Sequence, residues 1–329
     1  MKPFRFAIMG AGAIARHFCD AVRLVDGCCV TAVASKSMER AQRLAREKHI
    51  PQAFDSYEQM LQAHLADCVY IATTPDSHAA LTRLCVNHDV PVLCEKAMFM
   101  NSADASEVFA LAEARRVFTM EALWSRFLPA MRQARQWVRE GRIGTPVIAD
   151  MDLGFIAPQD PSARYLNPSL GGGAAYDLTV YGIQLLSYVL DRDLVRVQAE
   201  TVRSETGVDA TEALLLRFAG QVPAVVRASF MAPMEERMVI CGTAGRIVVP
   251  HAHYASSAIL CDGKGAELEC FQDTETQNGF TYEIEEVRRC VAAGLLESDT
   301  VPHSSTLACA KVFDLIAEQT RTQGEAPLP

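Results

Sequence analysis

Short apolar runs alternate with helical patterns along the first third of the chain. Runs typical of buried strands cover residues 4–9, 29–34, 67–72, 90–94 and 117–120. Patterns typical of helices cover residues 13–25, 38–48, 57–62 and 101–115, with a further helix expected between 78 and 90. Since strands that alternate with helices pair in parallel, this pattern predicts a doubly wound α/β sheet.

The pattern changes after residue 123. Helices are expected over 133–141 and 173–190 and a strand over 146–154, with a proline- and glycine-rich stretch, 155–173, between the last two. The strands that follow have no long helices between them: 195–202, 211–218, 223–230, 237–241, 246–249 and 258–261. Two helices, 280–293 and 304–320, come next, and the tail 324–329 is expected to fray. Consecutive strands predict a largely antiparallel sheet in an α+β domain.

The first strand runs directly into a glycine turn. Gly10 permits a tight turn, Gly12 removes the side chain where a backbone must approach a ligand, and Ala15 keeps the next helix close to the strand. Amides at that helix start would face a pyrophosphate. The predicted cofactor-binding residues here are Gly10, Gly12, Ala13 and Ile14. We therefore predict an N-terminal Rossmann dinucleotide-binding domain.

The end of the second strand bears on which dinucleotide is bound. Proteins that bind NAD usually carry an acidic residue here, but this chain has Ser35 and Lys36, with Arg40 one helical turn further on. Hydroxyl and cationic groups suit a 2′-phosphate, so we predict NADP, with NAD as the alternative. The other interpretation is that Ser37 only caps the next helix and that both cations are solvated.

Composition and length restrict the class of protein. The chain has 329 residues, half of them apolar, which favours two domains; we place them at 1–122 and 123–329. A net charge of −9 without basic runs argues against nucleic-acid binding. The sequence shows no membrane span and no signal peptide, so we expect a cytoplasmic protein.

The metal-binding residue types give no metal prediction. The eleven cysteines are scattered, without a C-x-x-C pair, and mostly lie in apolar patterns, so we expect buried free thiols. His251 and His253 form the closest histidine pair, but no third ligand is evident.

Polar residues follow the later strands of the first domain, where ligands of doubly wound sheets bind. Thr73, Thr74 and Pro75 could flank the cofactor, and His78 is either a cofactor contact or a packing residue. Glu95 and Lys96 follow the next strand and are either functional or a surface ion pair.

A second group of reactive residues lies in the second domain. Asp177 and Tyr181 are four residues apart, which places both on one face of a helix. Without further information, a tyrosine at this spacing is more often core and an aspartate more often a cap. The irregular stretch before them is a candidate substrate loop and contains Arg164 and Tyr165.

Together these motifs resemble the Gfo/Idh/MocA oxidoreductase family over nearly the whole chain. The resemblance rests on the glycine turn, the Thr73–Pro75 turn, the Glu95–Lys96 pair and the segment Gly171–Tyr181. Within the family, Glu95–Met98, Glu121–Phe127 and the tyrosine at 181 are most similar to the dimeric dihydrodiol dehydrogenase and NADP-dependent xylose dehydrogenase branch. Many members have proline after the lysine and histidine at the position of Tyr181, so the substrate need not be a sugar acid or inositol.

The resemblance implies an NADP-dependent enzyme that acts on a carbinol carbon of a cyclic polyol, sugar or trans-dihydrodiol. Tyr181 would be the general acid/base, Lys96 would lower its pKa and bind the reacting oxygen, and Asp177 would orient a neighbouring group. The expected substrate contacts are Trp124, Arg126, Phe127, Arg164 and Tyr165; the alternative for Trp124 and Phe127 is that they only pack the junction between the domains. The family also implies a homodimer formed through the C-terminal sheet. The alternatives are a keto-sugar (anhydro-sugar) reductase and a non-catalytic NADP-binding sensor of the same fold.

Overall fold

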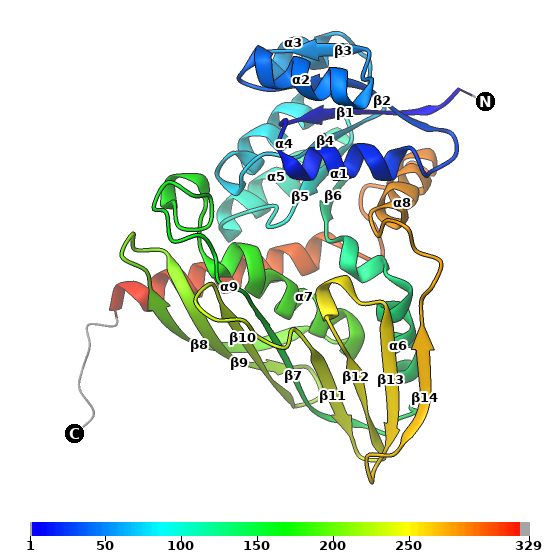
Figure 1. Cartoon of the computed structure of the whole chain (residues 1–329), viewed down its shortest axis with the longest axis vertical. Coiled ribbons are helices and arrows are strands. Elements are labelled where there is room, and N and C mark those ends of the chain that lie inside the picture. Colours follow the sequence, from blue (N-terminus) through cyan, green and yellow to red (C-terminus); the bar gives the residue numbers. More distant parts are fainter. Residues whose placement is uncertain (1, 323–329) are drawn as a thin grey trace. The chain divides into compact units, whose positions relative to one another are not determined.

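The computed structural model describes residues 2–322, so the predicted fraying of 324–329 lies outside the described residues. The chain forms two compact units (Figure 1). Unit 1 runs to Phe99 and adds Ala103–Trp124 and Gln277–His303; unit 2 comprises Met100–Ser102, Ser125–Thr276 and the chain from Ser304. The predicted division into 1–122 and 123–329 differs from these two units. In the structure, residues 277–303 belong to unit 1 although they follow most of unit 2 in the sequence.

Unit 1 contains a six-stranded sheet in the order β3-β2-β1-β4-β5-β6, with every pairing parallel. The strands are β1 (Phe4–Met9), β2 (Cys28–Ala34), β3 (Gln52–Phe54), β4 (Cys68–Ile71), β5 (Val92–Glu95) and β6 (Thr119–Ala122). The helices are α1 (Ala13–Val22), α2 (Met38–Lys48), α3 (Tyr57–Gln62), α4 (His78–Asn87), α5 (Ser102–Arg115) and α8 (Thr281–Ala292). The predicted doubly wound parallel sheet is confirmed.

The strand order of unit 1 reverses at β1. The chain moves outward from β1 to β2 and β3 and then returns to β4 on the other side of β1. In open α/β sheets this is the point where ligands bind, outside the carboxyl ends of the strands. The turns that follow β1, β2 and β4 therefore lie where a dinucleotide is expected.

Unit 2 contains an eight-stranded sheet in the order β14-β13-β12-β11-β7-β10-β9-β8. Its strands are β7 (Pro146–Gly154), β8 (Leu194–Arg203), β9 (Asp209–Phe218), β10 (Val222–Ser229), β11 (Met238–Gly242), β12 (Gly245–Val249), β13 (Ser257–Asp262) and β14 (Glu267–Gln272). Only β7 and β10 pair in parallel among these described strands. The prediction of a largely antiparallel sheet is confirmed.

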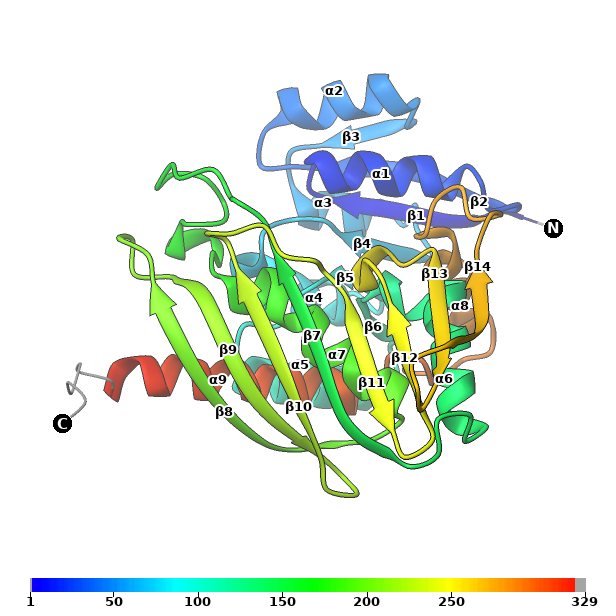
Figure 2. The same ribbon diagram turned by 60° about the horizontal axis from the view of Figure 1, so that its bottom comes forward.

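Helices cover one face of the unit 2 sheet (Figure 2). They are α6 (Pro129–Arg139), α7 (Val180–Leu190) and α9 (His303–Thr322). Ten of the eleven residues of α7 are buried, so it forms the centre of this core. Alternation along β9 buries Leu214 and Leu216 and leaves Leu215 50% exposed.

Several predicted boundaries and elements differ from the structure. Helix α6 begins at Pro129 instead of residue 133, because proline is well tolerated in the first helical turn. Helix α1 ends at Val22, three residues before its predicted end. Strands β3 and β14 were not predicted: β3 has only three residues, and β14 is an exposed edge strand without apolar alternation.

The described helices and cysteines bear on two further expectations. No helix among residues 2–322 is long and apolar enough to cross a membrane. All eleven cysteines are free and seven are buried. Burial raises the pKa of Cys19 to about 12, which keeps this thiol protonated and unreactive.

Candidate active site

In the glycine turn after β1, Gly10 packs closely against the neighbouring backbone, whereas Gly12 faces open space. Gly10 has φ +108°, and a Cβ there would lie 2.5 Å from the carbonyl oxygen of Ala72, so only glycine fits the turn. A Cβ on Gly12 would meet no atom within 4 Å. Gly12 is the N-cap of α1, which begins at Ala13 and Ile14 and has no acidic residue in its first turn. This open, positive helix end fits a dinucleotide pyrophosphate.

The β2–α2 turn carries the residues predicted to select the nucleotide. Ser35 is buried, and its Oγ accepts a hydrogen bond from the Ser37 amide at 3.4 Å. Ser37 in turn accepts from the Arg40 amide at 3.3 Å and so caps α2, as one of the two interpretations proposed. The side chains of Lys36 and Arg40 are exposed.

The turn after β4 is tied together by hydroxyl groups. Ser77 Oγ donates to Thr73 Oγ1 at 2.7 Å and to the Thr74 carbonyl at 3.0 Å, and Pro75 begins a 3-10 turn, Pro75–Ser77. His78 lies directly behind it, fully buried. Its ring nitrogens lie 2.9 Å from the carbonyl oxygen of Ala97 and 3.1 Å from that of Thr73. This placement favours the packing role for His78 over contact with a cofactor.

Three buried side chains hold the backbone of the loop that carries Lys96. His78 contacts the Ala97 carbonyl, Glu121 accepts from the Met98 amide at 3.0 Å, and Glu95 accepts from the Lys96 amide at 3.3 Å. The three side chains are at most 7% exposed. Lys96 itself is only partly buried. The loop is therefore a rigid support for one ammonium group at the carboxyl end of β5.

Glu95 belongs to a buried polar cluster beneath this loop. Its carboxylate accepts a hydrogen bond from the Tyr70 hydroxyl on β4. Burial and the charge of Glu95 raise the pKa of Glu283 on α8 well above its usual value. These contacts place Glu95 within the support of the Lys96 loop, which argues against its predicted role as a cofactor contact.

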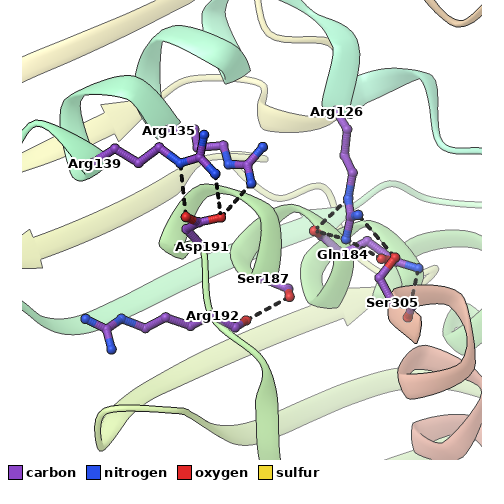
Figure 3. Close-up of polar contacts among 8 residues, drawn as sticks. All are labelled: Arg126, Arg135, Arg139, Gln184, Ser187, Asp191, Arg192 and Ser305. Atoms are coloured by element: carbon purple, nitrogen blue, oxygen red, sulfur yellow. Dashed lines mark hydrogen bonds and ion pairs between the residues drawn. The ribbon is translucent and has the colours of Figure 1, made fainter. Parts of the chain in front are cut away.

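Arg126 is a structural residue of unit 2 (Figure 3). It is 2% exposed and donates to the Gln184 carbonyl at 2.9 Å and to Ser305 Oγ at 3.2 Å. The neighbouring Phe127 is fully buried, and Trp124, in unit 1, packs 5.2 Å from the ring of Phe280. For Arg126 and Phe127 this placement argues against the predicted contact with substrate.

The other predicted substrate residues gather around Asp177. Arg164 lies 3.3 Å from the Asp177 carboxylate, and its guanidinium stacks 4.1 Å from the centre of the Tyr165 ring. A Cβ on Gly172 would lie 2.8–2.9 Å from the backbone oxygens of Arg164, Tyr165 and Asn167. Glycine at 172 therefore lets the loop approach the segment that bears Asp177.

Asp177 and Tyr181 lie on two consecutive helical segments. Asp177 is in a π-helical turn, η4 (Ala175–Thr179), and Tyr181 is in the first turn of α7. The predicted single helix over 173–190 is thus wound more loosely at its start. Single π turns within helices are frequent at functional sites.

Two features near these residues were not predicted. The His253 ring lies 5.3 Å from the Tyr181 ring, although the sequence showed His253 only as half of a weak histidine pair. Glu212 is 1% exposed on β9 and accepts a hydrogen bond from Thr179 Oγ1 at 2.5 Å. The sequence contained a signal for this burial, because Glu212 shares the strand period of Leu214 and Leu216.

In the described part of the chain, no group of three or more His, Cys, Asp or Glu residues could hold a metal ion.

Comparisons with family models cover most of the chain. Residues 4–122 match the model of an oxidoreductase family with an NAD-binding Rossmann fold, and residues 131–248 match the GFO/IDH/MocA C-terminal domain.

Among known proteins, the chain is similar to trans-1,2-dihydrobenzene-1,2-diol dehydrogenases. It is 30% identical to that of Xenopus tropicalis, covering 96% of this chain and 97% of the relative. It is 32% identical to that of Mus musculus, covering 94% and 95%.

Solved structures share the fold at lower identity. An aldose-aldose oxidoreductase from Caulobacter crescentus is 22% identical, covers 97% of this chain and 98% of its own, and has a TM-score of 0.87. The 3-ketoreductase KijD10 from Actinomadura kijaniata, in complex with NADP and TDP-benzene, is 22% identical, covers 96% and 97%, and has a TM-score of 0.84. The chain is therefore a member of the Gfo/Idh/MocA oxidoreductase family, a dehydrogenase with an NAD(P)-binding Rossmann domain that acts on hydroxyl groups.

Proposed function

We propose that this enzyme transfers a hydride between NADP and a carbinol carbon of a cyclic polyol, sugar or trans-dihydrodiol. The proposal rests on Lys96, whose loop at the end of β5 is held by buried side chains. It also rests on Asp177 and Tyr181, which lie four residues apart where η4 leads into α7. The names of relatives at 30–32% identity support the dihydrodiol within this substrate class.

The proposed roles follow from the chemistry of each side chain. In the oxidative direction Tyr181 takes the hydroxyl proton as the carbon gives up its hydride, and in the reductive direction it returns that proton. Lys96 binds the reacting oxygen. Asp177, paired with Arg164, orients the substrate hydroxyl next to the reacting one. The bound nicotinamide supplies the acceptor or donor of the hydride.

The fit of the first unit supports NADP as the cofactor. Ser35 and Lys36 lie between β2 and α2, and Arg40 lies in the first turn of α2. No carboxylate stands at the position of Ser35 to repel a 2′-phosphate. The two exposed cations are available for charge-assisted contacts.

The cofactor preference is testable with a double substitution. Replacing Lys36 and Arg40 by alanine is expected to raise the Kd for NADPH by about tenfold or more, because two charge-assisted hydrogen bonds are lost, and to leave the Kd for NADH unchanged. Fluorescence titration of both nucleotides measures this. Arg43→Ala, an exposed change on the same helix, is the matched control. An equal loss for both nucleotides would contradict the assignment.

The function itself is tested by one assay. NADP⁺ reduction is followed at the nicotinamide absorbance with trans-dihydrodiols, pentoses and inositols, and NADPH oxidation with keto-sugars. Turnover of a diol or cyclic polyol supports the proposal, and turnover only of keto-sugars supports the reductase alternative. Tight NADPH binding without turnover in either direction supports the sensor.

We also propose a cytoplasmic homodimer formed through the unit 2 sheet. The sheet face opposite the helices carries half-exposed apolar side chains, including Val195 (59% exposed), Val202 (65%) and Leu215 (50%). Apolar side chains grouped on one sheet face are typical of an interaction surface. Eleven free cysteines are typical of a reducing compartment.

A further inference from the structure

Two carboxyl groups of β9 lie beneath the π-helical turn that carries Asp177. Asp209 Oδ2 accepts a hydrogen bond from the Ala175 amide at 2.5 Å, at the first residue of η4. Glu212 Oε2 accepts from Thr179 Oγ1 at 2.5 Å, at the last residue of η4. The turn is therefore fastened at both ends by carboxyl groups that are three residues apart on one strand.

The backbone of the neighbouring Gly173 leaves room for the Asp209 carboxylate. Gly173 has φ +131°, and a Cβ there would lie 2.3 Å from Asp209 Oδ1 and 3.0 Å from Oδ2. No other residue fits both this backbone conformation and the approach of the carboxylate. The absence of a side chain at Gly173 thus lets the Asp209 carboxylate reach the first residue of η4.

The two carboxyl groups differ in their access to water. Glu212 is 1% exposed, and its second oxygen, Oε1, has no hydrogen-bond partner among the described residues. Asp209 lines a cavity of about 200 Å³ together with Tyr176, Arg203 and Phe313, which is large enough for water. Burial and then the charge of Asp209 raise the pKa of Glu212 well above its usual value, and burial raises the pKa of Asp209 to about 6. Because Glu212 is buried and Asp209 is close to it, the two carboxyl groups cannot both ionise near neutral pH without a large electrostatic cost.

Other ionisable groups surround the pair on neighbouring elements. Tyr176 lies on η4, Asp314 on α9 and Arg203 on β8. Arg227 of β10 pairs with Ala213, so it lies on the opposite face of the sheet from Glu212. Burial and the charges of Asp209, Asp314 and Glu212 raise the pKa of Tyr176 to about 12, so this tyrosine stays neutral over the working pH range.

We propose that Asp209 and Glu212 are positioning residues that hold η4, and with it Asp177, in the geometry needed for turnover, and that they do so as a pair that retains one proton. Glu212 keeps the proton in its dry position, and Asp209 stays ionised and holds the Ala175 amide. Loss of the second proton places two negative charges under the turn and loosens it. This inference rests on the proposed function of Asp177.

The test uses the full-length chain and variants at both ends of the turn. Asp209→Ala and Thr179→Val each remove one fastening hydrogen bond. Glu212→Ala removes the carboxyl group, whereas Glu212→Gln reproduces its protonated form. Glu200→Gln, an exposed change on β8, is the matched control.

Hydrogen–deuterium exchange of the peptide that spans residues 173–181 reports on the turn without requiring a substrate. We expect exchange to rise about tenfold or more in Asp209→Ala and Thr179→Val and to stay unchanged in Glu200→Gln. Exchange that is unchanged in the first two variants overturns the proposal, whatever the activity.

Steady-state kinetics then test the link to turnover. Glu212→Ala is expected to lower kcat by about tenfold or more with little change in the Kd for NADPH, and Glu212→Gln is expected to restore most of that loss. Wild-type kcat should fall on the alkaline side, and Glu212→Gln should remove that part of the pH dependence. Raised exchange with unchanged kcat, or identical pH profiles for wild type and Glu212→Gln, overturns the positioning role. Absence of wild-type turnover on every substrate refutes the proposed function instead, and the exchange data then decide separately whether the pair holds the turn.

Discussion

At the scale of single residues, burial distinguishes supporting side chains from those proposed to react. His78, Glu95 and Glu121 are charged or polar, yet they are at most 7% exposed and bind the backbone around Lys96. Arg126 is equally buried and is held by Gln184 and Ser305 (Figure 3). Buried polar groups persist only where hydrogen bonds replace water, so their cost is offset by fixing a backbone segment.

The first prediction concerns the proton carrier and the lysine. Tyr181→Phe removes the hydroxyl that moves the proton and is expected to lower kcat by about 10²–10⁴-fold without changing the Kd for NADPH. Lys96→Met is expected to act in the same direction, since the reacting oxygen loses its cation. Steady-state kinetics and nucleotide titration measure both effects. Tyr188→Phe on the same helix is the control, and full turnover in Tyr181→Phe would remove the assignment.

At the scale of elements, the start of α7 is the most specialised segment. It begins with a π-helical turn, follows three glycines and rests on β9. Gly172 admits the loop that carries Arg164, and Gly173 admits the Asp209 carboxylate. Each glycine is needed because another chain segment occupies the space of its missing side chain.

Gly173→Ala tests this packing directly. The added Cβ would lie 2.3 Å from Asp209 Oδ1 at a φ of +131°, so we expect a loss of about 1–3 kcal/mol in the free energy of unfolding. Chemical denaturation measures it. Gly263→Ala is the control, because its Cβ would have its nearest contact at 3.5 Å and no positive φ is involved. Equal stability of both variants would contradict the account of Gly173.

A pH-dependent prediction belongs to the β9 strand. The unfolded chain releases the protons of Asp209 and Glu212 near pH 4, whereas the folded chain retains them to higher pH because their pKa values are raised. At these two groups the folded state therefore binds more protons, and their contribution to stability falls as pH rises above about 4. Glu212→Gln should lose less stability than wild type between about pH 5 and pH 8 in thermal melts. Parallel melting curves for the two proteins would argue against the retained proton.

At the scale of the whole molecule, the two units have different kinds of sheet. Unit 1 has a parallel sheet with a strand-order reversal that suits a dinucleotide. Unit 2 supplies the helix with Asp177 and Tyr181 on one face of its sheet and half-exposed apolar side chains on the other. The second face is the proposed dimer surface.

The dimer prediction is tested by placing a charge on that face. Leu215→Glu is expected to convert the dimer to a monomer in light scattering coupled to size exclusion, because a carboxylate would be buried without a partner. Leu24→Glu in unit 1 is the control, since Leu24 is 49% exposed and Leu215 is 50% exposed. A dimer that persists in Leu215→Glu would place the interface elsewhere.

The sequence by itself determined the parallel sheet, the glycine turn and the residues proposed to act in catalysis. These features depend on local periodicity and on motifs of a few neighbouring residues, such as Gly10 and Gly12 or Asp177 and Tyr181. Local patterns are visible in a sequence because backbone geometry repeats over two to four residues.

Only the tertiary structure decided which of the predicted site residues are buried and hydrogen-bonded to distant segments. The burial of Arg126, the contact of His78 with the Lys96 loop and the fastening of η4 by Asp209 and Glu212 each join segments far apart in the chain. The sequence does not show whether a charged side chain is hydrogen-bonded to water or to a carbonyl group far away in the chain. Its role is therefore set by the partner that the fold brings to it, which no local pattern contains.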